Sequence, residues 1–246
     1  MQAAATAQSR LLGLQSIDTA IAQLEHRRRS LPELAQIAEK QQLRRRQGEQ
    51  LIAANTAVSD LELDVAKAEA DLVPVRERLE RDQQRVNSGA VTDPKQLNAL
   101  LDEIEHLKRR IGDLEDVELE LMEQLEQATA TRDEVNAARA EGEVELRALL
   151  AVRDEQLAVL DAELAERNTE RAAVAAEIPG ELLDLYDRIR AKSGTGAAAL
   201  VRRRCSGCQL EANASDLTRY RAAPPDEVLR CEECNRILVR TAESGL

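Results

Sequence analysis

The chain of 246 residues contains two Tyr and no Phe or Trp, so it lacks the aromatic residues that usually fill the thick core of a globular enzyme. Charged residues make up 33% of the chain, and the apolar 43% is nearly all Ala, Leu, Val and Ile, which is typical of long helices and coiled coils. The net charge of −12 opposes binding to phosphate backbones unless basic residues are segregated, and the composition disfavours an α/β enzyme fold.

The first predicted helix runs from Gln8 to about Arg29 and has its aliphatic residues on one face. A break at residues 30–32 follows, and Ser30 and Glu33 have the spacing of a capping box. The first residues lack the basic leader and apolar run of a secretory signal, and no stretch reaches the roughly 18 to 20 apolar residues of a membrane helix. We therefore expect a cytoplasmic protein in a reducing compartment, with no membrane partner.

Two heptad series predict a long antiparallel coiled-coil hairpin in a mainly α protein. The first series steps by seven residues through Ile37, Arg44, Leu51, Val58, Val65, Leu72, Leu79 and Val86. The second series passes through Leu97, Ile104, Ile111 and Leu125 and is broken by Glu118. We expect Arg44 to extend into solvent or to pair with an acidic residue of the opposite arm. Pro74 lies off the seam and should bend its helix or destabilise it by about 3 kcal/mol.

Residues 88–93 predict the turn between the two arms. Gly89 permits a positive φ, Asp93 can cap the second arm, and Pro94 suits the first helical position. The first arm, residues 33–87, would be roughly 80 Å long and the second, residues 94–178, roughly 125 Å long at the rise of an α-helix. We therefore expect the helix that ends near Arg29 to cover the excess length of the second arm.

We place the helical hairpin domain at residues 1–180, because Pro179 and Gly180 end the second arm. Residues 181–196 form a predicted short helix and linker, and the apolar residues of that helix can pack against the base of the hairpin. Residues 197–246 form the last predicted domain and contain every cysteine of the chain.

Cys205 and Cys208, with Cys231 and Cys234, form two Cys-x-x-Cys pairs separated by 22 residues. Four thiolates can close a tetrahedron around Zn²⁺ at about 2.3 Å, and the metal can replace the core that so short a domain cannot build. We therefore predict one structural zinc with no open position for a substrate. Two disulfides, a redox dithiol and a rubredoxin-like iron site are the alternatives, and the inferred compartment and the absence of a βαβ pattern disfavour the first two. Strand-like runs at residues 197–201, 227–230 and 236–240, with a short helix at 216–221 capped by Ser215, predict a small three-stranded β zinc ribbon.

Three segments of the sequence resemble the bacterial C4-type zinc ribbon domain family, whose members have an N-terminal coiled-coil hairpin and a C-terminal ribbon. They are residues 88–97 with 103–111, residues 185–190, and the two cysteine pairs, of which the second continues as Cys-Glu-Glu-Cys-Asn-Arg-Ile-Leu. The resemblance covers essentially the whole chain, and the Ala- and Arg-rich composition is similar to that of an actinobacterial member. It implies an elongated adaptor, in a family whose members are described as binding nucleic acid, an alternative sigma factor, or secretion and flagellar components.

The arginines of the ribbon define the second candidate function. Residues 195–246 contain eight Arg and seven Asp or Glu, so this segment is near neutral while the rest of the chain carries the negative charge. The hypothesis is that these arginines contact phosphate, and the alternative is that they merely make the protein soluble. The arginines concerned are Arg202, Arg203, Arg204, Arg219, Arg221 and Arg236. Tyr220 is the one aromatic residue on which a base could stack within the ribbon.

The sequence thus predicts a non-enzymatic adaptor that binds a partner through its ribbon and its hairpin. A protein partner, for example from the transcription or secretion machinery, is the first expectation, and DNA or RNA is the second. No nucleophile–base arrangement and no Gly-rich phosphate loop is present, so we expect neither catalysis nor a small-molecule substrate.

Overall fold

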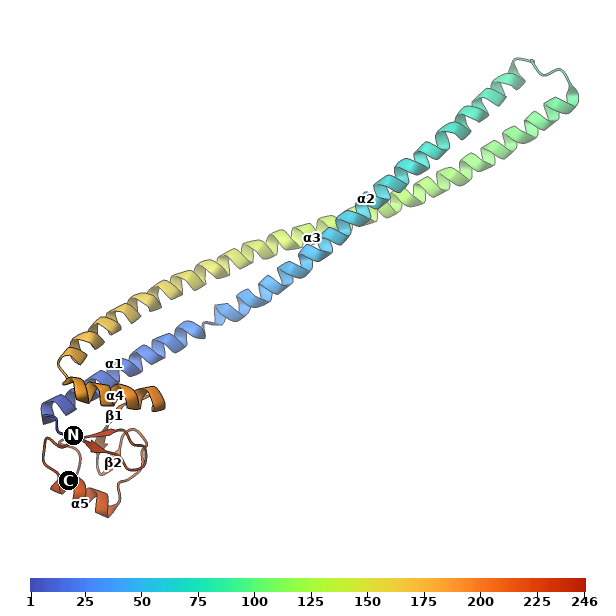
Figure 1. Ribbon diagram of the computed structural model, residues 1–246. Helices are drawn as coiled ribbons and strands as arrows, with labels where there is room; N and C mark the ends of the chain where they lie inside the picture. The colour runs from blue at the N-terminus through green and yellow to red at the C-terminus, as the bar shows by residue number, and fades with distance from the viewer. The chain divides into compact units, whose positions relative to one another are not determined.

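A computed structural model describes all 246 residues, which form five helices and four strands (Figure 1). The helices are α1 (Ala5–Arg29), α2 (Pro32–Asn87), α3 (Pro94–Ala176), α4 (Gly180–Ser193) and α5 (Ala214–Ala222). The strands are β1 (Ala197–Val201), β2 (Arg204–Cys205), β3 (Leu229–Arg230) and β4 (Ile237–Arg240). The fold is therefore mainly α with a small C-terminal sheet, as the sequence predicts. None of the helices combines the length and the apolar character needed to cross a bilayer.

Internal contacts divide the chain into two compact units. We call residues 35–150 the hairpin unit, and residues 1–34 together with 151–246 the ribbon unit. This division differs from the domain limits drawn from the sequence, because the first 34 residues pack with the ribbon and with the end of α3. The sequence places those residues with the hairpin because their helix is expected to cover the excess length of the second arm.

In the hairpin unit, α2 and α3 run antiparallel, and their predicted seam residues are the ones withdrawn from solvent. Val58 and Leu72 of α2 and Ile104 and Leu107 of α3 are buried, whereas off-seam residues such as Leu63 are exposed. Ion pairs flank the seam, among them Lys40–Glu145, Arg76–Glu115 at 2.6 Å and Arg78–Glu103 at 2.7 Å. The predicted pairing of Arg44 is confirmed, since its Nε donates to Glu143 of α3 at 3.2 Å.

The turn between α2 and α3 has the predicted construction. Gly89 has a φ of 68°, a value that a residue with a Cβ adopts only with strain. The side chain of Asp93 accepts a hydrogen bond from the backbone N–H of Lys95 at 2.9 Å, and its carbonyl accepts one from Leu97. Asp93 is thus the cap that begins α3, with Pro94 as the first helical residue.

The predicted capping box at the start of α2 is wrong. The hydroxyl of Ser30 donates to the carbonyl of His26 at 2.8 Å, and the backbone N–H of Ser30 also donates to that carbonyl. Ser30 therefore ends α1 and does not cap α2, because its hydroxyl is bonded to a carbonyl in the last turn of the previous helix. Helix α1 itself begins at Ala5, three residues before the predicted start.

The ribbon has four strands, and the prediction of three was wrong. The order across the sheet is β2-β1-β4-β3, with β1 and β4 parallel and the two outer pairs antiparallel. The missed strand, β2, has two residues, of which the second is Cys205, so no periodicity marks it. Helix α5 also differs from the prediction, because Asn213 and not Ser215 caps it, accepting from the N–H of Asp216 at 2.8 Å.

Both faces of this sheet are covered. Ile237 and Val239 of β4 and Ala197 of β1 pack with α1 and α4 in one hydrophobic cluster. Leu238 of β4, with Leu200 of β1, faces a second cluster beneath the cysteines. Side chains alternate between the two faces of a strand, so a run of three buried aliphatic residues at 237–239 is what a strand with two covered faces requires.

Candidate metal centre and the surface around it

Two knuckles with the same hydrogen-bond pattern present the cysteines. In the first, the N–H of Gln209 donates to the carbonyl of Cys205 at 2.8 Å. In the second, the N–H of Asn235 donates to the carbonyl of Cys231, also at 2.8 Å. Gln209 and Asn235, each the residue after the second cysteine of its pair, have φ values of 63° and 60°. The residue after the second cysteine is thus left-handed in both knuckles, and its N–H closes the turn on the carbonyl of the first cysteine.

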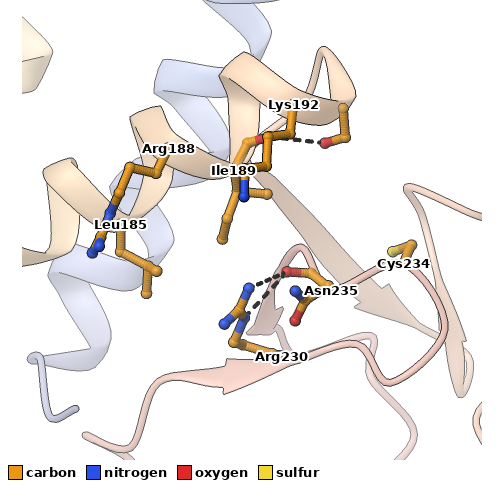
Figure 2. Close-up of a pocket in the computed structure, with 8 residues that line it drawn as sticks. Leu185, Arg188, Ile189, Lys192, Arg230, Cys234 and Asn235 are labelled. Carbon is orange, nitrogen blue, oxygen red and sulfur yellow. Dashed lines mark hydrogen bonds between the residues drawn. The ribbon is translucent and has the colours of Figure 1, made fainter.

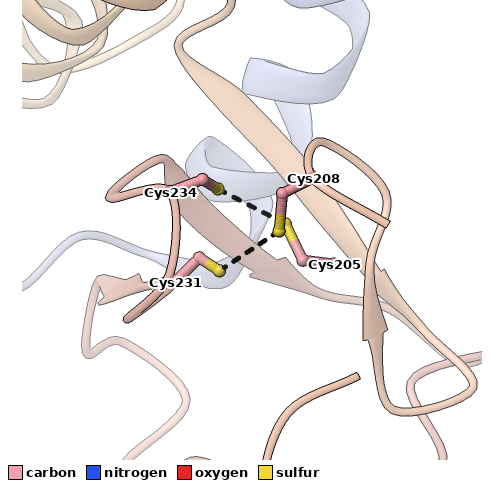
Figure 3. A group of neighbouring side chains, drawn as sticks. All are labelled: Cys205, Cys208, Cys231 and Cys234. Atoms are coloured by element: carbon pink, nitrogen blue, oxygen red, sulfur yellow. Dashed lines mark hydrogen bonds between the residues drawn. The ribbon is translucent and has the colours of Figure 1, made fainter. Parts of the chain in front are cut away.

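The four sulfurs fit a tetrahedral zinc ion (Figure 3). All four Sγ atoms lie within 4.8 Å of one another, and the Cys205–Cys234 and Cys208–Cys231 pairs are each 3.8 Å apart. A regular tetrahedron with arms of about 2.3 Å has edges of about 3.8 Å, so these separations are those of sulfurs around a shared zinc. A disulfide needs about 2.05 Å, so the sulfurs are too far apart for one.

The surroundings of the sulfurs shift the pKa values of the thiols in different directions. Burial raises the pKa of Cys205 and of Cys231. Hydrogen bonds from backbone N–H groups to both sulfurs act in the opposite direction, but they do not outweigh burial. Burial also acts to raise the pKa of Cys234, but the backbone N–H and side chain of Arg236 outweigh it, so that pKa is lowered. A bound divalent cation stabilises the charged form of each group, so that all four are thiolates. With four protein sulfurs as ligands, no position is left for water or substrate.

The six arginines singled out from the sequence lie in different surroundings. Arg202 and Arg203 form the two-residue turn between β1 and β2, with φ values of 46° and 65°, and neither makes an ion pair. Arg204 pairs with Glu211 at 3.6 Å, and Arg219 pairs with Glu232 and Asp216. Arg236 donates to Thr195 and to the carbonyl of Ser193. The Nε of Arg203 donates to the carbonyl of Gly245 at 3.4 Å, whereas Arg221 is exposed on α5 and unpaired. Arg202 and Arg221 are therefore the free guanidinium groups of the set, and Arg203 is without an ion pair.

Tyr220, the one aromatic residue of the ribbon, is not available for stacking on a base. Its side chain is 1% exposed, and its hydroxyl donates to the carbonyl of Arg230 at 3.2 Å. The guanidinium of Arg219 lies 5.3 Å from the centre of its ring. Tyr220 therefore belongs to the core beneath the cysteines.

Comparison with protein families decides what this arrangement of hairpin and knuckles is. Residues 14–194 match the CT398-like coiled coil hairpin domain, and residues 204–238 match the C4-type zinc ribbon domain. The chain belongs to the CT398-like coiled-coil hairpin family. The zinc ribbon of this CT398-like protein is of the C4 type, and its four neighbouring cysteines hold one structural zinc.

Relatives of this CT398-like chain are found in mycobacteria, which are actinobacteria. The protein Rv2229c of Mycobacterium tuberculosis is 35% identical over 98% of both chains. A solved structure from Mycobacterium smegmatis is also 35% identical and covers 98% of this chain and 100% of its own, with a TM-score of 0.85. CT398 of Chlamydia trachomatis shares the fold at 18% identity, with a TM-score of 0.72 over 96% of this chain and 98% of its own.

A buried polar cluster joins the helices to the ribbon in this CT398-like protein, and sequence reasoning missed it. The carboxylate of Asp18, on α1, accepts from Arg171 of α3 at 2.7 Å and from the hydroxyl of Tyr186 of α4 at 2.7 Å, and it pairs with Arg190 at 3.2 Å. The Oε1 of Gln15, one turn earlier, accepts from the backbone N–H of Gly196 at 2.7 Å. The one available signal was spacing, since Asp18 follows the buried Leu11 by seven residues, where an apolar residue is expected.

Proposed function

We propose that the protein is a non-enzymatic adaptor that binds a protein partner through its zinc ribbon and its coiled-coil hairpin. The two matched domains support a non-catalytic structural or binding role, and neither describes an enzyme family. The observation that carries the proposal is the fixed docking of the ribbon on helices α1 and α4. Its sheet shares one hydrophobic cluster with both helices, and the Asp18 cluster ties the same elements together. A surface held in this way is preorganised, which lowers the entropic cost of binding a partner.

Site-specific photocrosslinking in cells tests this proposal. A photoreactive amino acid replaces Thr92, in the turn of the hairpin unit, or Arg221, on the exposed side of the ribbon. The expected result is a discrete protein adduct from at least one of these positions, identified by mass spectrometry. The matched control places the same residue at Glu155, on the exposed face of α3. Adducts that are equally abundant at all three positions would contradict the adaptor role.

A specific observation supports nucleic-acid binding as the second candidate. Two-residue hairpin turns with positive φ at both positions strongly favour Gly, Asn or Asp, yet this turn consists of Arg202 and Arg203. The strain is accepted at a place where two exposed arginines make no ion pair. Fluorescence anisotropy with DNA and RNA at two salt concentrations tests phosphate contact. Replacing both arginines with Gly should relieve the strain and lower the salt dependence, and no binding at low salt would eliminate this candidate.

A further inference from the structure

A pocket of about 240 Å³ lies between helix α4 and the second zinc knuckle, within the ribbon unit (Figure 2). Helix α4 supplies Leu185, Arg188, Ile189, Lys192 and Ser193, and the ribbon supplies Arg230, Cys234 and Asn235. Figure 2 shows the α4 side chains on one side of the space and Arg230 and Asn235 opposite them. Neither the metal centre nor the docking of the ribbon on α1 accounts for this opening.

The charge on the lining of this pocket has one sign. Arg188, Lys192 and Arg230 line it, no carboxylate does, and none of the three makes an ion pair. The hydrogen bonds of the two arginines go to backbone carbonyls instead, from Arg188 to Asp184 at 3.2 Å and from Arg230 to Asn235 at 3.1 and 3.2 Å. In a chain with a net charge of −12, three unpaired cations around one opening form a site for an anionic group.

The remaining lining and the size of the pocket point to a peptide. Leu185 and Ile189 give it an apolar wall, and no aromatic residue offers a platform for a base. Pockets for drug-sized ligands measure about 300 to 1,000 Å³, so this one is smaller and suits a single side chain. An apolar wall with cations at the rim is complementary to an apolar side chain flanked by carboxylates.

We propose that this pocket binds an acidic segment of a partner protein and accepts one apolar side chain of that segment. The apolar side chain lies against Leu185 and Ile189, and flanking Asp or Glu side chains pair with Arg188, Lys192 and Arg230. This proposal rests on the adaptor function and names the chemistry of its partner.

Fluorescence anisotropy with the zinc-loaded full chain tests the pocket directly. The probes are short labelled peptides of Asp and Glu around one central residue, which is Ala, Val, Leu, Ile, Met or Phe, together with a matched peptide whose central residue is Ser. We expect saturable binding at low salt for at least one apolar peptide, and binding about tenfold weaker for the Ser peptide. The double variant Arg188→Glu/Lys192→Glu should abolish binding. Both positions are exposed at the pocket, and the two substitutions reverse its charge. An oligouridine RNA is the competing probe.

A matched double variant separates the pocket from a general effect of charge. Arg202→Glu/Arg221→Glu makes the same change in net charge at exposed ribbon positions away from the pocket, and it should leave peptide binding unchanged. Equal losses in both variants, binding of none of the apolar peptides, or oligouridine bound in place of the peptides would overturn the proposal. So would loss of zinc from Arg188→Glu/Lys192→Glu, because the cations would then be counter-ions of the metal centre. The crosslinking experiment at Thr92 and Arg221 does not use this pocket, so the adaptor function can hold when the pocket proposal fails.

Discussion

Gly196 shows how closely single residues control the joint between helix α4 and strand β1. A Cβ at this position would lie 2.5 and 2.6 Å from two ring carbons of Tyr186 and 2.7 Å from its carbonyl oxygen. Because a ring and a backbone cannot both move aside in a packed core, we expect Gly196→Ala to lower the free energy of unfolding of the ribbon unit by about 1 to 3 kcal/mol. Urea unfolding followed by circular dichroism measures the change.

Gly13 provides the matched control for that substitution. It lies within α1, and a Cβ there would meet nothing within 4 Å. Gly13→Ala should therefore stabilise the protein by up to about 1 kcal/mol through helix propensity. A Gly196→Ala variant as stable as the unmodified protein would show that Tyr186 does not fill the space next to Gly196.

Asp18 is the residue whose loss should most disturb the ribbon unit. Its side chain is fully buried and faces Arg171 and Arg190, whose side chains are 24% and 30% exposed. Asp18→Asn leaves Arg190 without a carboxylate and Arg171 with Asp187 alone, and we expect a loss of about 2 kcal/mol in the free energy of unfolding. Asp161→Asn is the control, since its pair with Arg28 is half exposed and should contribute under about 1 kcal/mol. Equal losses in the two variants, measured by urea unfolding, would show that Asp18 contributes no more to stability than an exposed ion pair.

Tyr186 makes the stability of the ribbon unit fall at alkaline pH. Burial raises its pKa, and the hydrogen bond to the Asp18 carboxylate raises it further. The folded state therefore holds the phenolic proton when the unfolded chain, with a pKa of about 10, has lost it. The stabilisation is complete below about pH 10 and decreases as the pH rises above that value. Unfolding free energies between neutral and alkaline pH should show this slope, and Tyr186→Phe should reduce it to the part that Tyr220 contributes.

At the scale of elements, Pro74 lowers the stability of helix α2. The helix is continuous from Pro32 to Asn87, so Pro74 removes one helical hydrogen bond, and its ring crowds the carbonyl of Ala70. The predicted bend at this position stays a prediction. Since Pro74 is exposed, Pro74→Ala should raise the free energy of unfolding of the hairpin unit by up to about 3 kcal/mol, and with it the melting temperature. Calorimetry measures it, and an unchanged or lower melting temperature would mean that a bend at Pro74 is needed for the pairing of α2 with α3.

The elements that could be predicted are those encoded by patterns along the chain. The seam follows from a seven-residue step, the turn from Gly89 and Asp93, and the metal centre from the spacing of four cysteines. Strand β2 could not be predicted, because its two residues are defined only by their pairing with β1. The same holds for the Asp18 cluster, because Gln15 and Asp18 lie 153 to 181 residues away from their partners and meet them only in the packed protein. The pocket beside Cys234 likewise requires α4 and β3 to be placed next to each other.

At the scale of the whole molecule, the two ends of the chain share one folding unit. The N–H of Ala3 donates to the carbonyl of Asp226 at 2.7 Å, and the side chain of Gln8, which is buried, donates to the carbonyl of Ala3 and to those of Pro225 and Glu227. Leu11 and Leu14 of α1 lie in the same cluster as Ile237 of β4. Damage to the ribbon should therefore reach residues more than two hundred positions away in the sequence.

Removal of zinc provides the test of this coupling. Elemental analysis of the purified protein should find about one zinc per chain, and a chelator should release it. Hydrogen exchange should then lose protection in residues 197–246 and also in residues 1–14, because the sheet that buries α1 no longer has its metal. Residues 35–150 form their own unit and should keep their protection, which serves as the internal control. Protection that is unchanged at residues 1–14 would mean that the packing of α1 on the sheet survives without zinc, and that the metal stabilises only the knuckles.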